Sequence, residues 1–307
     1  MMLDDLAFLG QIAVRSSAGV LFAALGEIVA ERSGVLNLGV EGMMLMGALA
    51  GAATGIATGS LALAVLAGMA AGLLLSAVHA AFAVSLGANQ TLSGLALAIL
   101  GTGLASFLGR PILGEVGVRF KPWALPFLSD IPWLGQVLFR QTVPVYLGYL
   151  LVPLLGWLLF RSRLGLMVRA AGEDAVSADA MGVHVARIRW ACTLFGGAMA
   201  GLGGAYLSLS YTPGWKENMT GGQGWIAIAM VIFATWRPWR AAAGALLFGL
   251  LTALQFFFQA TGVQIVPIVI LRMLPYLLTI AVLCAVMRLG KGQGGAPAGL
   301  ALPFRRE

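Results

Sequence analysis

The feature that most constrains this chain is the recurrence of apolar stretches of about 20 residues, from its start to about residue 288. A helix of roughly 20 apolar residues crosses the hydrocarbon core of a bilayer, which is about 30 Å thick. Hydrophobic residues make up 60% of the chain and charged residues 10%, with a mean hydropathy of +0.92. The sequence therefore predicts an integral membrane protein and excludes a water-soluble globular domain.

We predict an all-α fold, a polytopic transmembrane bundle of eight or nine helices with broken helices at its centre. The second segment, with its broken entry, and the seventh segment leave the number of helices open. The predicted spans are residues 11–31, 36–59, 61–86, 90–109, 143–160, 189–210, 222–236, 241–259 and 267–287.

Polar residues interrupt the apolar pattern early in the chain, in the stretch GEIVAERSGVLNLGVEGMMLMGALAG. One hydrophobic segment ends in Glu27, Glu31 and Arg32, and the next begins around Asn37 and Glu41. Inside a membrane, every backbone donor and acceptor that such a break leaves unpaired must form a hydrogen bond to protein or to water in a cavity. The break therefore points to a path for a solute.

The ends of the chain and its cysteines indicate no further chemistry. Cys192 and Cys284 lie inside apolar segments, where packing is expected rather than a disulfide or a metal site. We predict no cofactor. The start, MMLDD, lacks the basic region of a cleaved signal. The glycine-rich and proline-rich residues 289–307 are expected to form a flexible tail.

Lysine and arginine predict the orientation, because cytoplasmic loops carry an excess of these residues. Most of the 19 basic residues fall on one face, so the C-terminus is expected on the cytoplasmic side. The side of the N-terminus depends on the number of helices. The basic residues assigned to the cytoplasmic face are Arg32, Arg161, Arg163, Arg169, Arg187, Arg189, Arg237, Arg240, Arg288, Lys291, Arg305 and Arg306.

Each side of the membrane has one long loop. The outer loop, 110–142, contains Trp123 and Trp133, so it either lies on the membrane surface or offers a docking face to an external binding protein. In the inner loop, Asp174 can cap a helix of about two turns that stops at Gly182. The apolar surface of this short helix suits either the groove of a partner protein or lipid headgroups.

Four motifs in order resemble one family of membrane proteins. They are LGEIVAERSGVLNLGVEGMMLMGA, ANQTLSGLALAILGTGLASFLGRP, GEDAVSADAMGVHVARIR followed by GGAMAGLGGAY, and GWIAIAMVIFATWRP. Together they resemble the permease subunits of ABC importers in the branched-chain amino acid, ribose and nucleoside permease superfamily. The resemblance covers about residues 10–290 and is strongest to the nucleoside or simple-sugar branch.

The resemblance implies a permease domain over residues 1–288 with inverted halves and without ATPase activity of its own. The chain contains no GxxxxGK[ST] loop, so ATP hydrolysis is expected on a separate ATPase subunit. Further implied partners are a second, related permease and an extracytoplasmic solute-binding protein; membrane lipid is expected and nucleic acid is not. The residues that match the coupling helix of the family are Glu173, Asp174, Ala178, Asp179, Met181 and Gly182.

The resemblance also places polar residues on the translocation path. They are Asn37 and Glu41 at the broken entry of the second helix, and Asn89, Gln90 and Thr91 at the start of the fourth. Amides suit a ligand with hydroxyls and ring nitrogens. The alternatives are that Asn89 caps its helix and that Glu41 forms a salt bridge with Arg32.

Two further polar residues lie within predicted spans. Arg272 must snorkel to the interface, pair with an acid or face a cavity, and we assign it to the path. His79 lies on an apolar helix, where a hydrogen-bonded packing role is favoured over a ligand role.

The resemblance thus implies a multi-pass permease subunit of a bacterial plasma (inner) membrane that carries nucleosides or a related small polar solute. Alternative solutes are simple sugars, branched-chain amino acids or a flavin vitamin. An alternative from another class is a secondary transporter or channel that works without ATP. A membrane enzyme is disfavoured because neither HExxH nor GxSxG occurs in the chain.

Overall fold

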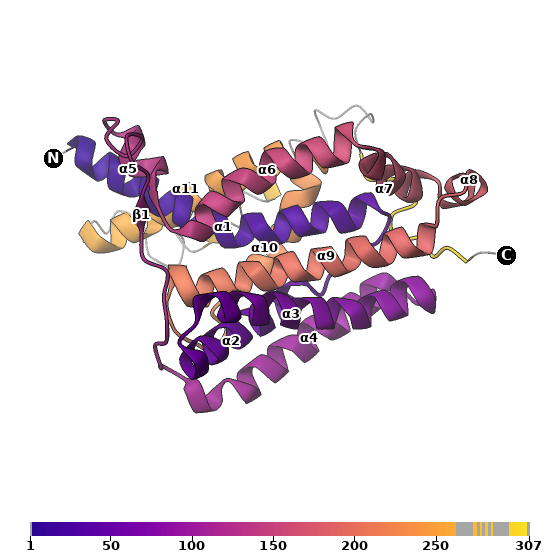
Figure 1. The fold of residues 1–307 in the computed structure, drawn as a ribbon, viewed down its shortest axis with the longest axis horizontal. Helices are drawn as coiled ribbons and strands as arrows, with labels where there is room; N and C mark the ends of the chain where they lie inside the picture. Colours follow the sequence, from indigo (N-terminus) through magenta and orange to yellow (C-terminus); the bar gives the residue numbers. More distant parts are fainter. Residues whose placement is uncertain are drawn as a thin grey trace.

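The computed structural model describes residues 2–261, 273–274, 277, 280–281, 284 and 295–305. The described part is a bundle of helices, and two short strands, β1 (Trp123–Ala124) and β2 (Arg140–Gln141), pair in one loop (Figure 1). The expected all-α polytopic fold is confirmed. The helices are α1 (Met2–Arg32), α2 (Val40–Thr58), α3 (Leu61–Ala80), α4 (Gln90–Leu108), α5 (Leu134–Leu138), α6 (Val143–Arg161), α7 (Arg163–Glu173), α8 (Ala175–Ala180), α9 (Val185–Tyr206), α10 (Gln223–Phe233) and α11 (Pro238–Thr261).

Among the described residues, seven helices are long and apolar enough to cross a membrane. They match the first six predicted spans and the eighth within a few residues, except that α1 begins earlier. The seventh span corresponds to α10, whose 11 residues extend about 16 Å, roughly half of the hydrocarbon core. Arg272 lies outside the described residues, as does most of the predicted ninth span, 267–287.

Two sets of three helices pack across one another at the centre of the bundle. α1 and α9 run antiparallel: the hydroxyl of Tyr206 donates to the carbonyl of Arg15 (2.8 Å), and Nε of Arg189 donates to the carbonyl of Ser33 (3.2 Å). α3 packs on α9 and α11 packs on α1, while α2 contacts α9 and α10 contacts α1. The first set, α1–α3, and the second, α9–α11, therefore contact each other reciprocally: α2 and α3 pack on α9, and α10 and α11 pack on α1.

Glycine lets these helices approach at backbone distance. A Cβ atom at Gly201 of α9 would overlap the carbonyl oxygen of Gly68 on α3, and one at Gly204 would overlap that of Met44 on α2. Small residues have this role in membranes because packing, rather than the exclusion of water, drives the association of helices there. The GGAMAGLGGA stretch of α9 provides this close approach.

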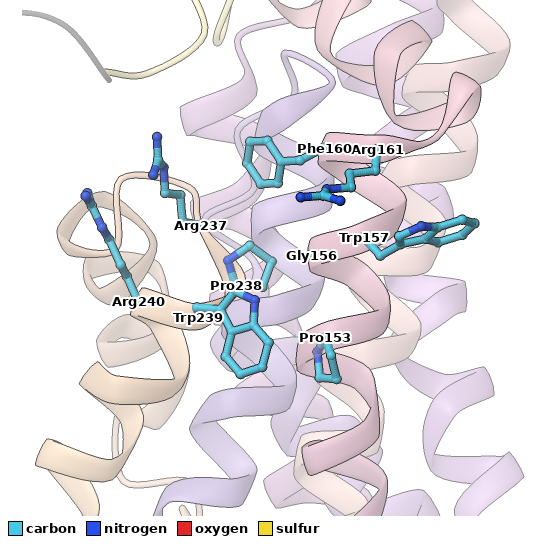
Figure 2. A pocket seen from close by; sticks show the side chains of 9 residues that line it. All are labelled: Pro153, Gly156, Trp157, Phe160, Arg161, Arg237, Pro238, Trp239 and Arg240. Carbon is cyan, nitrogen blue, oxygen red and sulfur yellow. The ribbon is translucent and has the colours of Figure 1, made fainter.

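The two ends of the bundle carry different features (Figure 1). One end holds the N-terminus, α5 and the paired strands, and the other holds α7, α8 and the C-terminal residues. At this second end, α6 and α11 leave a groove that Arg161, Arg237 and Arg240 help to line (Figure 2). The structure thus gathers these three arginines, all assigned to the cytoplasmic face, at the end that carries α8.

The C-terminal residues differ from the flexible tail that composition predicts over 289–307. In the part that is described, the N–H of Gly299 donates to the carbonyl of Gly172 (2.8 Å), and the N–H of Ala301 donates to the carbonyl of Gly34 (3.1 Å). These bonds satisfy carbonyls near the ends of α7 and α1, which lack partners within their own helices. Composition does not reveal them because they join distant parts of the chain.

We expect Gly201→Ala to destabilise the protein and Gly103→Ala to leave it at least as stable. The added methyl group of the first variant overlaps the backbone of α3, and overpacking of this kind costs about 1–3 kcal/mol. Gly103 is also helical, but a Cβ atom there meets nothing within 4 Å, and alanine is the better helix former. Thermal unfolding of both variants in one detergent measures the difference, and equal melting temperatures would contradict the close approach.

Candidate functional site

The segment between α1 and α2 is held by side chains from three helices. Oε1 of Glu27 on α1 accepts the N–H of Asn37 (3.0 Å), and Oε1 of Gln90 on α4 accepts the N–H of Leu36 (2.8 Å). Nε2 of His79 on α3 donates to the carbonyl of Leu36 (3.0 Å), so the predicted hydrogen-bonded role of His79 is confirmed. All three side chains are buried. Side chains of the protein therefore form hydrogen bonds with backbone groups that the break leaves without partners in a helix.

A fourth helix, α9, also supports the break, through Arg189. This buried guanidinium donates to the carbonyls of Ser33 (3.2 Å), Ala171 (3.3 Å) and Leu302 (2.9 Å). It thereby joins the end of α1 to α7 and to the C-terminal residues. The charge pattern predicts Arg189 as a loop residue because the predicted span begins there. In the structure, α9 begins one turn earlier and places Arg189 inside the bundle.

Asn37 shapes the start of α2. Its Oδ1 accepts the N–H of Gly39 (2.9 Å), and its Nδ2 contacts the sulfur of Met43 (3.4 Å). The side chain is fully buried. An asparagine that bonds the backbone two residues further on forms a local turn, which directs the chain into the helix. The structure therefore places Asn37 at the broken entry, as predicted, with its polar atoms bound to the protein.

Glu41 joins α2 to the start of the half-length helix α10. Its carboxylate accepts the hydroxyl of Thr220 (2.6 Å) and the N–H groups of Gly222 (3.0 Å) and Gly224 (2.7 Å). A carboxylate suits this position because the first N–H groups of a helix lack partners and carry partial positive charge. The alternative salt bridge between Glu41 and Arg32 is not formed.

The three polar residues at the start of α4 have different environments. Asn89 is exposed, and its Oδ1 caps the helix by accepting the N–H of Leu92 (3.0 Å). Gln90 is buried, and its Nε2 has no hydrogen-bond partner among the described residues. Thr91 is half-buried. The capping alternative for Asn89 is thus realised, and only Asn89 and Thr91 remain accessible.

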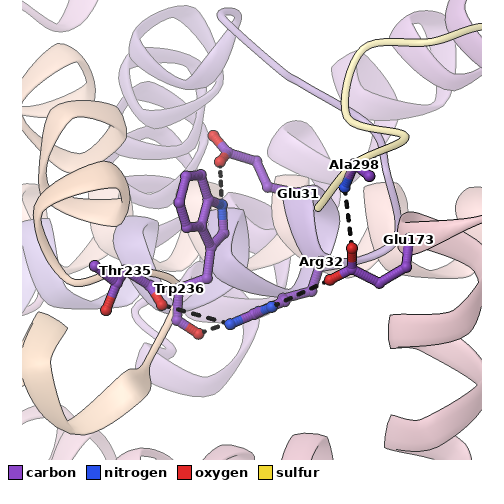
Figure 3. Close-up of polar contacts among 6 residues, drawn as sticks. All are labelled: Glu31, Arg32, Glu173, Thr235, Trp236 and Ala298. Atoms are coloured by element: carbon purple, nitrogen blue, oxygen red, sulfur yellow. Dashed lines mark hydrogen bonds and ion pairs between the residues drawn. The ribbon is translucent and has the colours of Figure 1, made fainter. Parts of the chain in front are cut away.

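Arg32, at the end of α1, connects several elements at the α8 end of the bundle (Figure 3). Its Nη1 lies 4.0 Å from Oε1 of Glu173, and its guanidinium donates to the carbonyls of Trp236 (3.5 Å) and Thr235 (3.4 Å). Glu173 also accepts the N–H of Ala298 (3.1 Å). Beside this cluster, the indole N–H of Trp236 donates to the buried carboxylate of Glu31. Arg32 therefore ties α1 to α7 and to the turn before α11.

The short inner-loop helix predicted over 173–182 is present as α8. Asp174 caps it by accepting the N–H groups of Val176 and Ser177 (both 3.1 Å). A hydrogen bond from the Ser177 hydroxyl, together with these two N–H bonds, lowers the pKa of Asp174. Gly182 follows the helix with φ +85°, the left-handed conformation that favours glycine.

Two large apolar side chains are exposed on α8 and at its C-terminal cap, beside the exposed polar Ser177. Val176 is 70% exposed and Met181 is 84% exposed. Ala178 is buried against Ala171 and Val185, so it attaches the helix to the rest of the protein. The predicted apolar surface is therefore carried by Val176 and Met181, while Ala178 faces inward.

The chain matches the model of a protein family described as the branched-chain amino acid transport system / permease component, over residues 9–283. This chain belongs to that family. The resemblance that the four motifs carry is thereby confirmed, and the protein is a multi-pass membrane permease.

Three relatives align with nearly the whole permease. It is 42% identical to the "Putative glucose ABC transporter permease protein" of Haloferax volcanii, over 96% of each chain. It is 34% identical to a nucleoside ABC transporter permease protein of Lactococcus lactis, over 87% of this chain and 88% of the relative. It is 33% identical to a guanosine ABC transporter permease protein of Bacillus subtilis, over 94% and 93%. No solved structure matches the chain.

We expect Gln90→Ala to destabilise the permease, whereas Asn89→Asp leaves its stability nearly unchanged. The first variant leaves the partly buried N–H of Leu36 without its acceptor, which costs about 1–3 kcal/mol. Aspartate caps a helix about as well as asparagine, so the second variant keeps the start of α4. Chemical or thermal unfolding in detergent compares the two. A fully stable Gln90→Ala protein would contradict the assigned role of Gln90.

Proposed function

We propose that this permease is the membrane-spanning subunit of an ABC importer for an uncharged solute with a hydroxylated sugar ring, with nucleosides as the first candidates. The observation that carries this proposal is the near full-length similarity to three ABC permeases named for glucose, nucleosides and guanosine. These solutes share an uncharged, hydroxylated ring. Branched-chain amino acids and a flavin vitamin are the alternatives.

The polar chemistry of the bundle supports an uncharged solute. Among the described residues, the carboxylates of Glu27 and Glu41 are buried and bound to backbone N–H groups. They are therefore occupied in holding the protein together. The accessible polar groups at the start of α4 are the amide of Asn89 and the hydroxyl of Thr91, which bond a solute without binding its charge.

The proposed translocation path passes the broken entry of α2 and the start of α4. In this proposal Asn89 and Thr91 meet the solute, while Asn37, Glu41 and Gln90 hold the backbone around them. A conduit of this kind needs weak contacts, because a solute that binds tightly leaves slowly. Specificity then rests mainly on a separate binding protein.

The energy for transport comes, in this proposal, from partners. The sequence has no GxxxxGK[ST] loop, so a separate subunit hydrolyses ATP. A second, related permease completes the membrane unit, and an extracytoplasmic binding protein delivers the solute. The end of the bundle that carries α8 faces the cytoplasm, as the positive-inside rule requires of its arginines, and places the C-terminus there.

The test of this function is to purify the tagged permease from its native membrane in mild detergent and to identify the proteins that accompany it. The co-purified assembly is then placed in liposomes, and uptake of labelled uridine, guanosine, glucose and leucine is measured with and without ATP. We expect an ATPase and a second permease to co-purify, and ATP-dependent uptake of a nucleoside or of glucose. Uptake by the chain alone without ATP would replace this proposal with a secondary transporter.

The path proposal makes a separate prediction for Asn89→Asp. This variant keeps the helix cap but exchanges the two amide donors for a charge, so we expect ATP-dependent uptake to fall at least tenfold while the melting temperature is unchanged. Uptake in the reconstituted assembly is the measurement. Unchanged uptake would mean that Asn89 serves only as a cap.

We further propose that α8 is the coupling helix and inserts into a groove of the ATPase subunit. The exposed apolar side chains of Val176 and Met181 support this proposal, since a short helix with an exposed apolar face is a common form of protein recognition. Asp174 and Gly182 fix the two ends of the helix, and Glu173 connects it to Arg32 on α1. Asp179 lies on the same helix.

We expect Val176→Asp to abolish co-purification of the ATPase subunit without unfolding the permease. The charge would have to enter an apolar contact without a partner, which costs several kcal/mol. Val116→Asp is the matched control, because Val116 is similarly exposed, at 63%, but lies in the outer loop. Retention of the ATPase by Val176→Asp, or its loss in both variants, would contradict docking through α8.

A further inference from the structure

A groove between two membrane-spanning helices combines an apolar wall with a basic rim (Figure 2). It lies between the C-terminal part of α6 and the start of α11 and has a volume of about 560 Å³. Figure 2 shows Arg161 extending from α6 toward α11, with the ring of Trp239 in the gap below it. The lining residues are Pro153, Gly156, Trp157, Phe160, Arg161, Arg237, Pro238, Trp239 and Arg240.

The rim is positively charged without a compensating acid. Among the nine described residues that line the groove, three are arginines and none is acidic. A further cation lies beside the wall, where the guanidinium group of Arg169 is 5.6 Å from the ring centre of Phe160; Arg32 lies at the same distance but is paired with Glu173. Neither nearby carboxylate pairs with an arginine of the rim: Glu173 faces Arg32, and Glu31 accepts the indole N–H of Trp236. An anion at the rim would relieve this repulsion.

The depth of the groove matches the geometry of a lipid. Arg161 is the last residue of the α6 span and Pro238 is the first residue of the α11 span, so the rim lies at a membrane surface. Pro153 lies eight residues before Arg161 on α6, about 12 Å deeper along the helix. Exposed Trp157 and Trp239 are typical of the interface between lipid and water. The groove therefore offers cations at headgroup level and apolar walls below them.

We propose that this groove binds an anionic phospholipid, with the phosphate between Arg161 and Arg237 and an acyl chain along Pro153 and Trp239. Basic pockets between transmembrane helices bind anionic headgroups in this way. A free phosphate would use the arginines but leave the apolar wall uncovered, so the shape of the groove selects a lipid. This binding does not depend on which solute the permease carries.

The test is native mass spectrometry of the full-length permease, titrated in detergent with phosphatidylglycerol and phosphatidylcholine. We expect phosphatidylglycerol to bind preferentially, and the double variant Arg161→Gln/Arg237→Gln to bind it about 30-fold more weakly, since each cation near a headgroup contributes about one kcal/mol. The matched control is Arg163→Gln/Arg187→Gln, which removes the same charge from exposed arginines outside the groove. Its affinity is expected to stay within about twofold of wild type.

Several outcomes would overturn the proposal. Equal binding of the two lipids, or an equal loss of affinity in both double variants, would mean general charge attraction. Competition by millimolar inorganic phosphate would mean a site for a small anion. Lipid binding unchanged in Arg161→Gln/Arg237→Gln, with loss of the ATPase subunit, would assign the arginines to a protein contact. If the double variant does not fold, Arg161→Gln alone is expected to weaken phosphatidylglycerol about fivefold.

Discussion

The bundle depends on satisfying the backbone hydrogen bonds at the break between α1 and α2. Unpaired donors and acceptors are costly inside a membrane because water is absent. The break is tolerated since Glu27, His79, Gln90 and Arg189 bring partners from α1, α3, α4 and α9. One short segment thereby fixes the relative positions of four helices. The substitution of a single partner is for this reason expected to affect the whole bundle.

Small residues make this network geometrically possible. Side chains from α3 and α9 reach the break only because the helix backbones lie close together, and glycines such as Gly201 and Gly204 permit that approach. Glycine also supplies positive φ where the chain turns, at Gly34 (φ +95°) in the break and at Gly222 (φ +85°) before α10. The high glycine content of the chain therefore serves both helix packing and chain reversal.

At the α8 end of the bundle, the proposed coupling helix, the break after α1 and the proposed lipid groove are connected by direct contacts. Glu173, next to the cap of α8, faces Arg32, and Arg32 bonds the carbonyls before α11. In the proposed importer, a displacement of α8 by the ATPase would reach the break and α11 through these contacts. The first residues of α11 also line the lipid groove, so a bound phospholipid would hold α11 against α6 at the place where this displacement arrives.

Local chemistry was readable from the sequence. Hydropathy located the described spans, since transfer into hydrocarbon acts on each segment separately, and Asp174 and Gly182 predicted the limits of α8 because capping involves neighbouring residues. The family followed from four motifs in order. The second and seventh segments leave the helix count open in the sequence; the structure makes the second a full span and the seventh a helix of 11 residues, too short for one.

The roles of the polar residues came from the folded arrangement. Glu41 bonds Thr220, 179 residues away, and Arg189 bonds Ser33, 156 residues away. A polar residue in an apolar segment looks the same in the sequence whether it meets a solute or holds a distant backbone. Only packing separates these cases, because it decides which polar atoms are already bonded within the protein and which remain accessible.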